Sequence, residues 1–299
     1  MLRLARLHFL IPGFLLYAMG CLLAISNGAS FDTIKFLFGY MIFGCAHVSV
    51  SFSNDYFDRK TDAQSVRTAF SGGSRVLVEH PQLENVALTL ALFFLATSTI
   101  GAALFTFVFA YSYWFLAFAV LGGLLGWFYT APPLKLAYRK LGELSAVLAV
   151  GLIMPGMGYF VSYGSIDSLF AVFVFPLSCY GFLFILTVEM PDIDSDRAAK
   201  KTNVLVKLGL RTGMRLSLFS AMAGTLFLVA INLLGILAGK VDLWFAAIFS
   251  LMPVVGVTSG LFADLNRREC LTRQITINMI AIILFLFLLD LYLLRQVIA

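Results

Sequence analysis

Long apolar stretches separated by short polar segments run along the whole chain. Nine of these stretches, each of about 20 residues, are apolar enough to cross the roughly 30 Å hydrocarbon core of a bilayer as helices. They cover residues 7–26, 34–53, 84–108, 110–130, 142–163, 166–188, 214–237, 241–263 and 274–296. The pattern therefore predicts an all-α integral membrane protein with nine transmembrane helices in a single membrane-embedded domain, residues 1–299.

The composition excludes an ordinary soluble domain. Of the 299 residues, 61% are hydrophobic and only 12% are charged. The first apolar stretch follows Arg3 and Arg6, as in a signal peptide, but it is longer than the usual apolar region of about 7–15 residues, so we interpret it as a helix. We expect membrane lipid as a partner and no nucleic acid, and the oligomeric state stays open.

Basic residues gather on one side of the predicted bundle. All of the 21 Lys and Arg residues except Lys35, Lys240 and Arg295 fall on the same side. Because basic loops stay in the cytoplasm, the N-terminus should be cytoplasmic and the C-terminus outside, in a multi-pass protein of the cell membrane. Two long connections, 54–83 and 189–213, lie on the cytoplasmic side, where we expect the active site.

Carboxylates spaced by four residues open both long connections. The first carries Asn54, Asp58 and Asp62, and the second carries Asp192 and Asp196. Residues four apart share one face of a helix, and carboxylates this close repel one another unless a cation is present. Mg²⁺ suits such sparse clusters because it also binds substrate phosphate oxygens. We therefore expect all five residues to bind Mg²⁺ and the four aspartates to be catalytic; solvated helix ends are the alternative.

Further charged residues surround these clusters. Asp55 and Asp194 break the four-residue spacing, so we expect them to face solvent or to support the ligands from behind. Basic side chains in the same loops are candidates for binding a diphosphate, together with Asn54, although basic loops also simply mark the cytoplasm. The basic residues of these loops are Arg67, Arg75, Lys135, Arg139, Lys140, Lys200, Lys201 and Arg211, of which we expect Arg67, Arg75, Lys135, Arg139 and Lys200 to contact the diphosphate.

Arg75 and Lys135 are the strongest of these candidates. Arg75 follows the run Ser-Gly-Gly-Ser at residues 71–74, and glycine allows a close approach of the backbone to a ligand. Lys135 follows the rigid pair Pro132 and Pro133 by two residues.

The two acidic motifs resemble those of the UbiA superfamily of membrane prenyltransferases, NDxxDxxxD and DxxxD. Asn54, Asp58 and Asp62 match the first signature, and Asp192 and Asp196 match the second. Segment 129–135 (YTAPPLK) is similar to the third cytoplasmic element of that family, although its spacing is longer than YxxxK. The resemblance implies a central cavity between nine helices, capped on the cytoplasmic side, where two Mg²⁺ ions bridge the carboxylates to an isoprenoid diphosphate donor.

The acceptor is also suggested by resemblance. Segment 70–77 (FSGGSRVL) resembles the naphthoate-type members of the menaquinone branch, which implies a small lipophilic or aromatic acceptor such as 1,4-dihydroxy-2-naphthoate. One alternative is the archaeal ether-lipid branch, with geranylgeranylglyceryl phosphate as acceptor. Another is an ion-coupled transporter, but transporter sites lie near the midplane, whereas these carboxylates cluster on one side.

Overall fold

The computed structural model describes residues 3–64 and 73–298, and every regular element within them is a helix. Eight helices are long and apolar enough to cross a membrane, and Leu10–Ser26 is a shorter apolar helix beside them. The all-α architecture predicted from the apolar pattern is therefore confirmed. That the chain crosses the membrane nine times stays a prediction.

Thirteen α-helices follow one another in the described residues. They are α1 (Leu10–Ser26), α2 (Thr33–Asp62), α3 (Val76–Glu79), α4 (Glu84–Val108), α5 (Tyr113–Thr130), α6 (Gly142–Leu148), α7 (Met154–Tyr163), α8 (Ser168–Glu189), α9 (Ile193–Ala198), α10 (Val204–Leu233), α11 (Trp244–Phe249), α12 (Leu251–Leu261) and α13 (Arg268–Ile298). A π-helical turn joins α6 to α7, and a single 3₁₀ turn joins α8 to α9.

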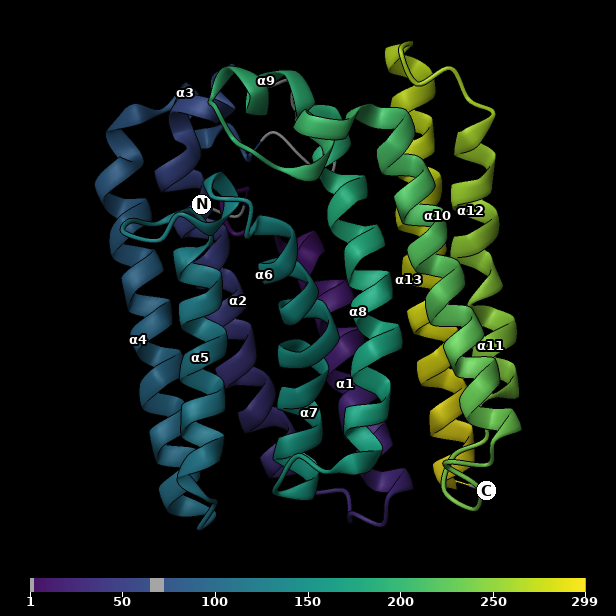
Figure 1. Ribbon diagram of the computed structural model, residues 1–299. Coiled ribbons are helices and arrows are strands. Elements are labelled where there is room, and N and C mark those ends of the chain that lie inside the picture. The colour runs from purple at the N-terminus through teal and green to yellow at the C-terminus, as the bar shows by residue number, and fades with distance from the viewer. Residues whose placement is uncertain (1–2, 65–72, 299) are drawn as a thin grey trace.

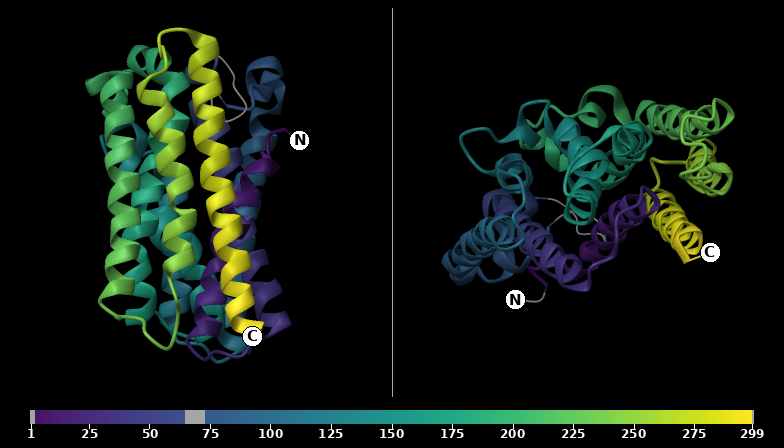
Figure 2. Two further views of the ribbon diagram at one scale, coloured as in Figure 1. Left: turned by 90° about the vertical axis from the view of Figure 1, so that its right-hand side faces the viewer. Right: turned by 90° about the horizontal axis from the view of Figure 1, so that it is seen from below.

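The long helices stand side by side as a bundle (Figure 1). Contacts run from α4 to α2, from α2 to α7, from α7 to α1, and on the other side from α8 through α10 and α12 to α13. Packing of α13 against α1 joins the two ends of the chain, and both helices lie together in the view from below (Figure 2). The short helices α3 and α9 cap one end of this bundle (Figure 1).

Small residues let two helices approach closely at the centre of the bundle. A Cβ atom added to Gly20 of α1 would lie 1.8 Å from the Pro155 carbonyl oxygen of α7, and one added to Gly158 of α7 would lie 1.9 Å from the Tyr17 carbonyl oxygen of α1. Within lipid, such close backbone packing is a main source of helix association, because hydrophobic burial gives no advantage there. The glycines therefore fix the distance between α1 and α7.

The two largest differences from the predicted helix boundaries both concern the connections that carry the acidic motifs. Helix α2 continues to Asp62 instead of ending near residue 53, so Asn54 and Asp58 lie within a helix and not in a loop. Helix α10 begins at Val204, ten residues before the predicted start, and is interrupted at Gly209, which has a φ of 79°. Apolar content marks the lipid-spanning part of a helix and does not detect its polar extensions into water.

A polar network closes the end of the bundle opposite α3 and α9. The Asn27 amide donates to Asp167 (2.7 Å) and to the Tyr159 hydroxyl (2.9 Å), and Lys240 donates to Asn27 (2.7 Å). Gln296 in the last turn of α13 donates to the Asp242 carbonyl (3.0 Å). Hydrogen bonds from Tyr159 and Asn27 keep the pKa of Asp167 below its ordinary value despite burial, which raises it.

Candidate active site

A cavity of about 140 Å³ lies at the capped end of the bundle, where the end of α2 faces the junction of α8 and α9. Residues from both acidic motifs line it. The lining consists of Arg6, Asn54, Asp58, Thr61, Asp62, Gly73, Tyr129, Ala137, Ile185, Val188, Glu189, Asp192, Ser195, Asp196, Lys201 and Asn203. Two segments more than 130 residues apart therefore meet, and all five predicted metal ligands border the same space.

Helix α2 supplies the first set of oxygen atoms, because its polar side chains four residues apart lie on the face that borders the cavity. Asn54 accepts a hydrogen bond from the Thr130 hydroxyl of α5 (2.8 Å), which fixes the amide. Asp58 accepts one from the Tyr138 hydroxyl (2.7 Å), and Thr61 lies 3.2 Å from the same hydroxyl. The side chains of α2 are thus oriented by residues of α5 and of the loop that follows it.

The second set comes from the turn between α8 and α9. Glu189 ends α8, the 3₁₀ turn Met190–Asp192 follows, and Asp196 lies in α9. The Asn203 amide donates to Asp196 (2.8 Å), while its carbonyl oxygen accepts from the Val206 backbone N–H (2.8 Å) and caps α10. The start of α10 therefore holds Asp196 in position.

Lys201 joins the two sets. Its ammonium nitrogen lies 3.0 Å from an oxygen of Asp196 and 3.5 Å from an oxygen of Asp58. Burial alone would lower the pKa of Lys201, but the neighbouring Asp58 and Asp196 carboxylates raise it well above its ordinary value. The lysine is therefore charged and occupies the space between carboxylates that otherwise repel one another.

Tyr138 is a residue of the site that the sequence did not single out. Besides its bond to Asp58, its ring is close to two ammonium groups, Lys201 at 5.0 Å and Lys135 at 5.7 Å from the ring centroid. Burial, followed by the charge of Asp58, raises the pKa of Tyr138 to about 12. The hydroxyl is therefore protonated at neutral pH and acts as a hydrogen-bond donor.

Asp55, the second residue of the first motif, is buried and does not face solvent. It forms an ion pair with Arg6 and accepts a hydrogen bond from the Ser74 hydroxyl, so it supports the site from behind, which was the other expectation for this residue. Asp194, by contrast, is exposed, with 90% of its side chain accessible. The sequence around a single aspartate in such a helical motif does not indicate whether the residue is buried or exposed.

Gly73 shows why a glycine-rich run follows the first motif. Its φ is +66°, and a Cβ atom there would lie 2.0 Å from the Asp62 carboxylate. Only glycine allows the loop to pass this close to the acidic helix. The backbone at Gly73 thereby borders the cavity beside Asp62.

Of the predicted diphosphate contacts that the structure describes, Asn54 lines the cavity and the basic ones lie farther out. Among the described residues, the cavity lining does not include Arg75, Lys135, Arg139 or Lys200. Arg75 is half-buried and the other three are exposed, while Arg67 lies outside the described residues. The basic side chains that do line the cavity are Arg6 and Lys201; Lys201 follows Lys200 directly in sequence, so sequence proximity alone could not separate the two.

The donor atoms fit a hard divalent cation that is shared with a substrate. Within the described part of the chain, no three His, Cys, Asp or Glu side chains are gathered tightly enough to hold a metal ion alone. Mg²⁺ needs only one or two carboxylates when phosphate oxygens complete its coordination. Oxygen Oε2 of Glu189 is buried and has no hydrogen-bond partner among the described residues, so the cavity wall offers an unused acceptor.

Comparison with known proteins shows the family of this chain. The model of the UbiA prenyltransferase family matches residues 14–290, nearly the whole chain. The chain belongs to the UbiA prenyltransferase family. Among its relatives is a 1,4-dihydroxy-2-naphthoate octaprenyltransferase of Bacillus subtilis (strain 168), 24% identical over 254 residues, which are 84% of this chain and 78% of the relative.

Solved UbiA structures share the fold. The apo structure of a UbiA homolog from Aeropyrum pernix K1 superposes with a TM-score of 0.72 over 95% of this chain and 98% of that chain, at 17% identity. A UbiA homolog from Archaeoglobus fulgidus bound to DMAPP and Mg²⁺ gives a TM-score of 0.65 over 96% and 99%, at 16% identity. This prenyltransferase is thus a multi-pass integral membrane protein of the UbiA fold.

Proposed function

We propose that this UbiA protein transfers a prenyl group from an isoprenoid diphosphate to an aromatic acceptor of the 1,4-dihydroxy-2-naphthoate type, with release of diphosphate. One observation carries the proposal: both acidic motifs border a single cavity, with Lys201 between Asp58 and Asp196. Such an arrangement is suited to a ligand that brings its own negative charge together with divalent cations.

Within this proposal, Asn54, Asp58, Asp62, Asp192 and Asp196 hold Mg²⁺, and Glu189 is a further candidate because its buried oxygen is unused. Mg²⁺ bound there would neutralise the charge of the diphosphate. Binding of Mg²⁺ and DMAPP by the Archaeoglobus fulgidus homolog supports this assignment. The number of ions, two by the family resemblance, belongs to the proposal.

The proposed reaction begins with departure of the negatively charged diphosphate. The bond between C1 of the prenyl chain and the diphosphate oxygen breaks, and its electron pair leaves with the diphosphate. Lys201 lines the cavity and is placed to donate hydrogen bonds to the leaving group as it gains charge, while the Tyr138 hydroxyl donates to Asp58 and orients that carboxylate. An electron-rich ring carbon of the acceptor then attacks C1, and the ring loses a proton or carbon dioxide.

The relative from Bacillus subtilis supports a naphthoate acceptor over other acceptors. We further propose that the protein lies in the cell membrane with this cavity open toward the cytoplasm. In support, Arg3 pairs with Glu79 of α3 at the capped end, where most basic loops lie.

A product assay tests the proposal. Purified protein is incubated with Mg²⁺, a radiolabelled prenyl diphosphate and a panel of acceptors that includes 1,4-dihydroxy-2-naphthoate and geranylgeranylglyceryl phosphate. We expect a prenylated naphthoate product, and a loss of turnover of at least about 10²-fold in Asp58→Ala and Asp192→Ala, because each removes a ligand whose charge acts in the transition state. Near-normal turnover in both variants, at normal amounts of folded protein, contradicts the proposed site.

A further inference from the structure

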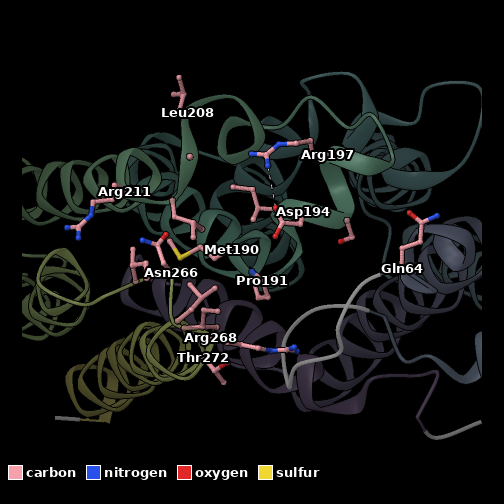
Figure 3. A pocket seen from close by; sticks show the side chains of 17 residues that line it. Gln64, Met190, Pro191, Asp194, Arg197, Leu208, Arg211, Asn266, Arg268 and Thr272 are labelled. Atoms are coloured by element: carbon pink, nitrogen blue, oxygen red, sulfur yellow. Dashed lines mark hydrogen bonds and ion pairs between the residues drawn. The ribbon is translucent and has the colours of Figure 1, made fainter.

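A second, larger pocket lies on the other side of α9. It has a volume of about 660 Å³ and is bounded by α9, the start of α10, the connection between α12 and α13, and the first turns of α13. We call it the arginine pocket, because Arg197, Arg211 and Arg268 are its cationic residues. Figure 3 shows these three side chains arranged around Met190 and Pro191.

The mouth of the arginine pocket is positively charged and its floor is apolar. Asp194 is the one carboxylate among its lining residues in the described chain, and it pairs with Arg197 at 3.4 Å. Arg211 donates one hydrogen bond to the Leu261 carbonyl (3.0 Å), which leaves its other N–H groups for a ligand. The floor contains Met190, Leu265 and Ile275, all of them buried.

Exposed apolar side chains next to the pocket indicate that it lies near the membrane boundary. Leu208 and Phe262, at 52% and 87% exposure, are large apolar side chains beside it that water would not favour. A smaller pocket of about 180 Å³ shares Arg211 and Leu265 with the arginine pocket, adds Arg215, and extends onto the seam between α10 and α12. Exposed apolar side chains continue along both helices below it.

We propose that the arginine pocket binds the headgroup of an anionic phospholipid, with the acyl chains lying along the seam of α10 and α12. Guanidinium groups bind phosphate oxygens strongly, and basic pockets between transmembrane helices suit anionic headgroups. A soluble phosphate would leave the apolar floor and seam uncovered. The apolar seam therefore favours a lipid over a free anion.

Lipid in this pocket would also affect the catalytic cavity, a consequence that rests on the proposed function. Ser195 of α9 lines both pockets, and Asp192 and Asp196 belong to the same segment. A headgroup held by Arg197 and Arg268 would restrain α9 and with it the second acidic motif. We therefore expect turnover to be faster in vesicles of phosphatidylglycerol than in vesicles of phosphatidylcholine.

Native mass spectrometry of the delipidated full-length protein tests the lipid site without any substrate. We expect phosphatidylglycerol to bind roughly tenfold more tightly than phosphatidylcholine. The double variant Arg211→Gln/Arg268→Gln should lose this preference, and Arg211→Lys/Arg268→Lys should keep most of it and show that the fold is intact. The matched control Arg267→Gln/Arg273→Gln removes two exposed charges that lie outside the arginine pocket and the smaller pocket next to it. This variant should retain the preference.

Three results overturn the proposal. Equal binding of the two lipids by the wild type would show that the pocket does not select an anionic headgroup. Equal losses in the pocket variant and the control variant assign the preference to general surface charge. Displacement of phosphatidylglycerol by inorganic diphosphate at equal concentration assigns the pocket to a free anion. Because these measurements contain no prenyl donor or acceptor, their outcome is independent of the proposed transferase activity.

Discussion

Lys201 lies between Asp58 and Asp196, where a divalent cation would also be favoured. In the absence of metal, the lysine is the cation that keeps the two acidic motifs together. By our proposal, Mg²⁺ bound between the motifs would leave the charge of Lys201 available to the diphosphate. The side chain thus has a structural role in one state and, by our proposal, a binding role in the other.

We predict that Lys201→Gln makes stability depend on Mg²⁺. Removing one partner of a buried ion pair costs about 3 kcal/mol or more, because the remaining carboxylates are left unpaired. In chelator, the variant should melt well below the wild type, and added Mg²⁺ should raise its melting temperature more than that of the wild type. Thermal unfolding in detergent, with and without chelator, measures both effects.

Lys200→Gln is the matched control, because Lys200 is adjacent but exposed and outside the cavity lining. Its melting temperature in chelator should equal that of the wild type. Equal destabilisation in both variants would mean that Lys201 has no special role as a bridge.

At the scale of elements, packing and polar termini explain what the apolar pattern could and could not predict. Residues 84–108 were expected to form a helix, and α4 covers the same residues, because apolar content and helix length coincide there. Residues 142–163 were expected to form one helix, yet a π turn at Ala149–Ile153 divides α6 from α7. Such a turn depends on neighbouring helices, and no hydrophobic period encodes it.

The candidate site, too, could be predicted only in part from the sequence. Spacing of four residues on helices predicted which face of α2 carries Asn54 and Asp58. Lys201 lies in a loop and Tyr138 in the short 3₁₀ turn Leu136–Tyr138, and neither segment is long enough for a period to relate sequence position to direction in space. Their contacts depend on how the chain turns after α9 and after α5; Pro132 and Pro133 mark the second turn but do not give its direction.

We predict that the close contact between α1 and α7 tolerates no side chain. Gly20→Ala places a methyl group against the Pro155 carbonyl, so the helices must separate, at a cost of about 1–3 kcal/mol. Gly44→Ala in α2 is the control, since a Cβ there meets no atom within 4 Å. We expect a lower melting temperature for Gly20→Ala and an unchanged or higher one for Gly44→Ala, because alanine favours helix. A wild-type melting temperature for Gly20→Ala contradicts this packing.

At the scale of the whole molecule, the two ends of the bundle differ in chemistry. Both acidic motifs lie at the capped end, together with Arg3 and α3. Lys240, Asn27 and the last turn of α13 lie at the other end, where hydrogen bonds connect them to neighbouring loops. The chain therefore begins near one end and finishes at the other (Figure 1).

We predict from this polarity that a reporter fused to the C-terminus is exposed outside the cytoplasm. The basic loops favour a cytoplasmic N-terminus, and an odd number of crossings then puts the other end outside. Paired fusions to an enzyme that is active only outside and to one that is active only in the cytoplasm measure the location. A cytoplasmic C-terminus would mean that the chain crosses an even number of times.

Binding of a non-hydrolysable prenyl diphosphate analogue measures whether the cavity holds the donor. The cavity is acidic, so cations must offset its charge before a diphosphate can bind. Arg75→Gln and Lys135→Gln should each weaken this binding by about tenfold to a hundredfold if these side chains reach the diphosphate, since a charged hydrogen bond contributes about 1.5–3 kcal/mol. Unchanged affinity in both variants would make them markers of membrane topology only.

Calorimetric titration of the wild-type protein with this analogue tests most directly whether the two acidic motifs form one metal-dependent site for the donor. We predict tight binding in Mg²⁺ and scarcely any binding in chelator, with Asp58→Ala and Asp192→Ala resembling the chelator result even when Mg²⁺ is present. Unimpaired binding of the analogue in chelator would contradict the claim, because the carboxylates could not then act through a metal ion.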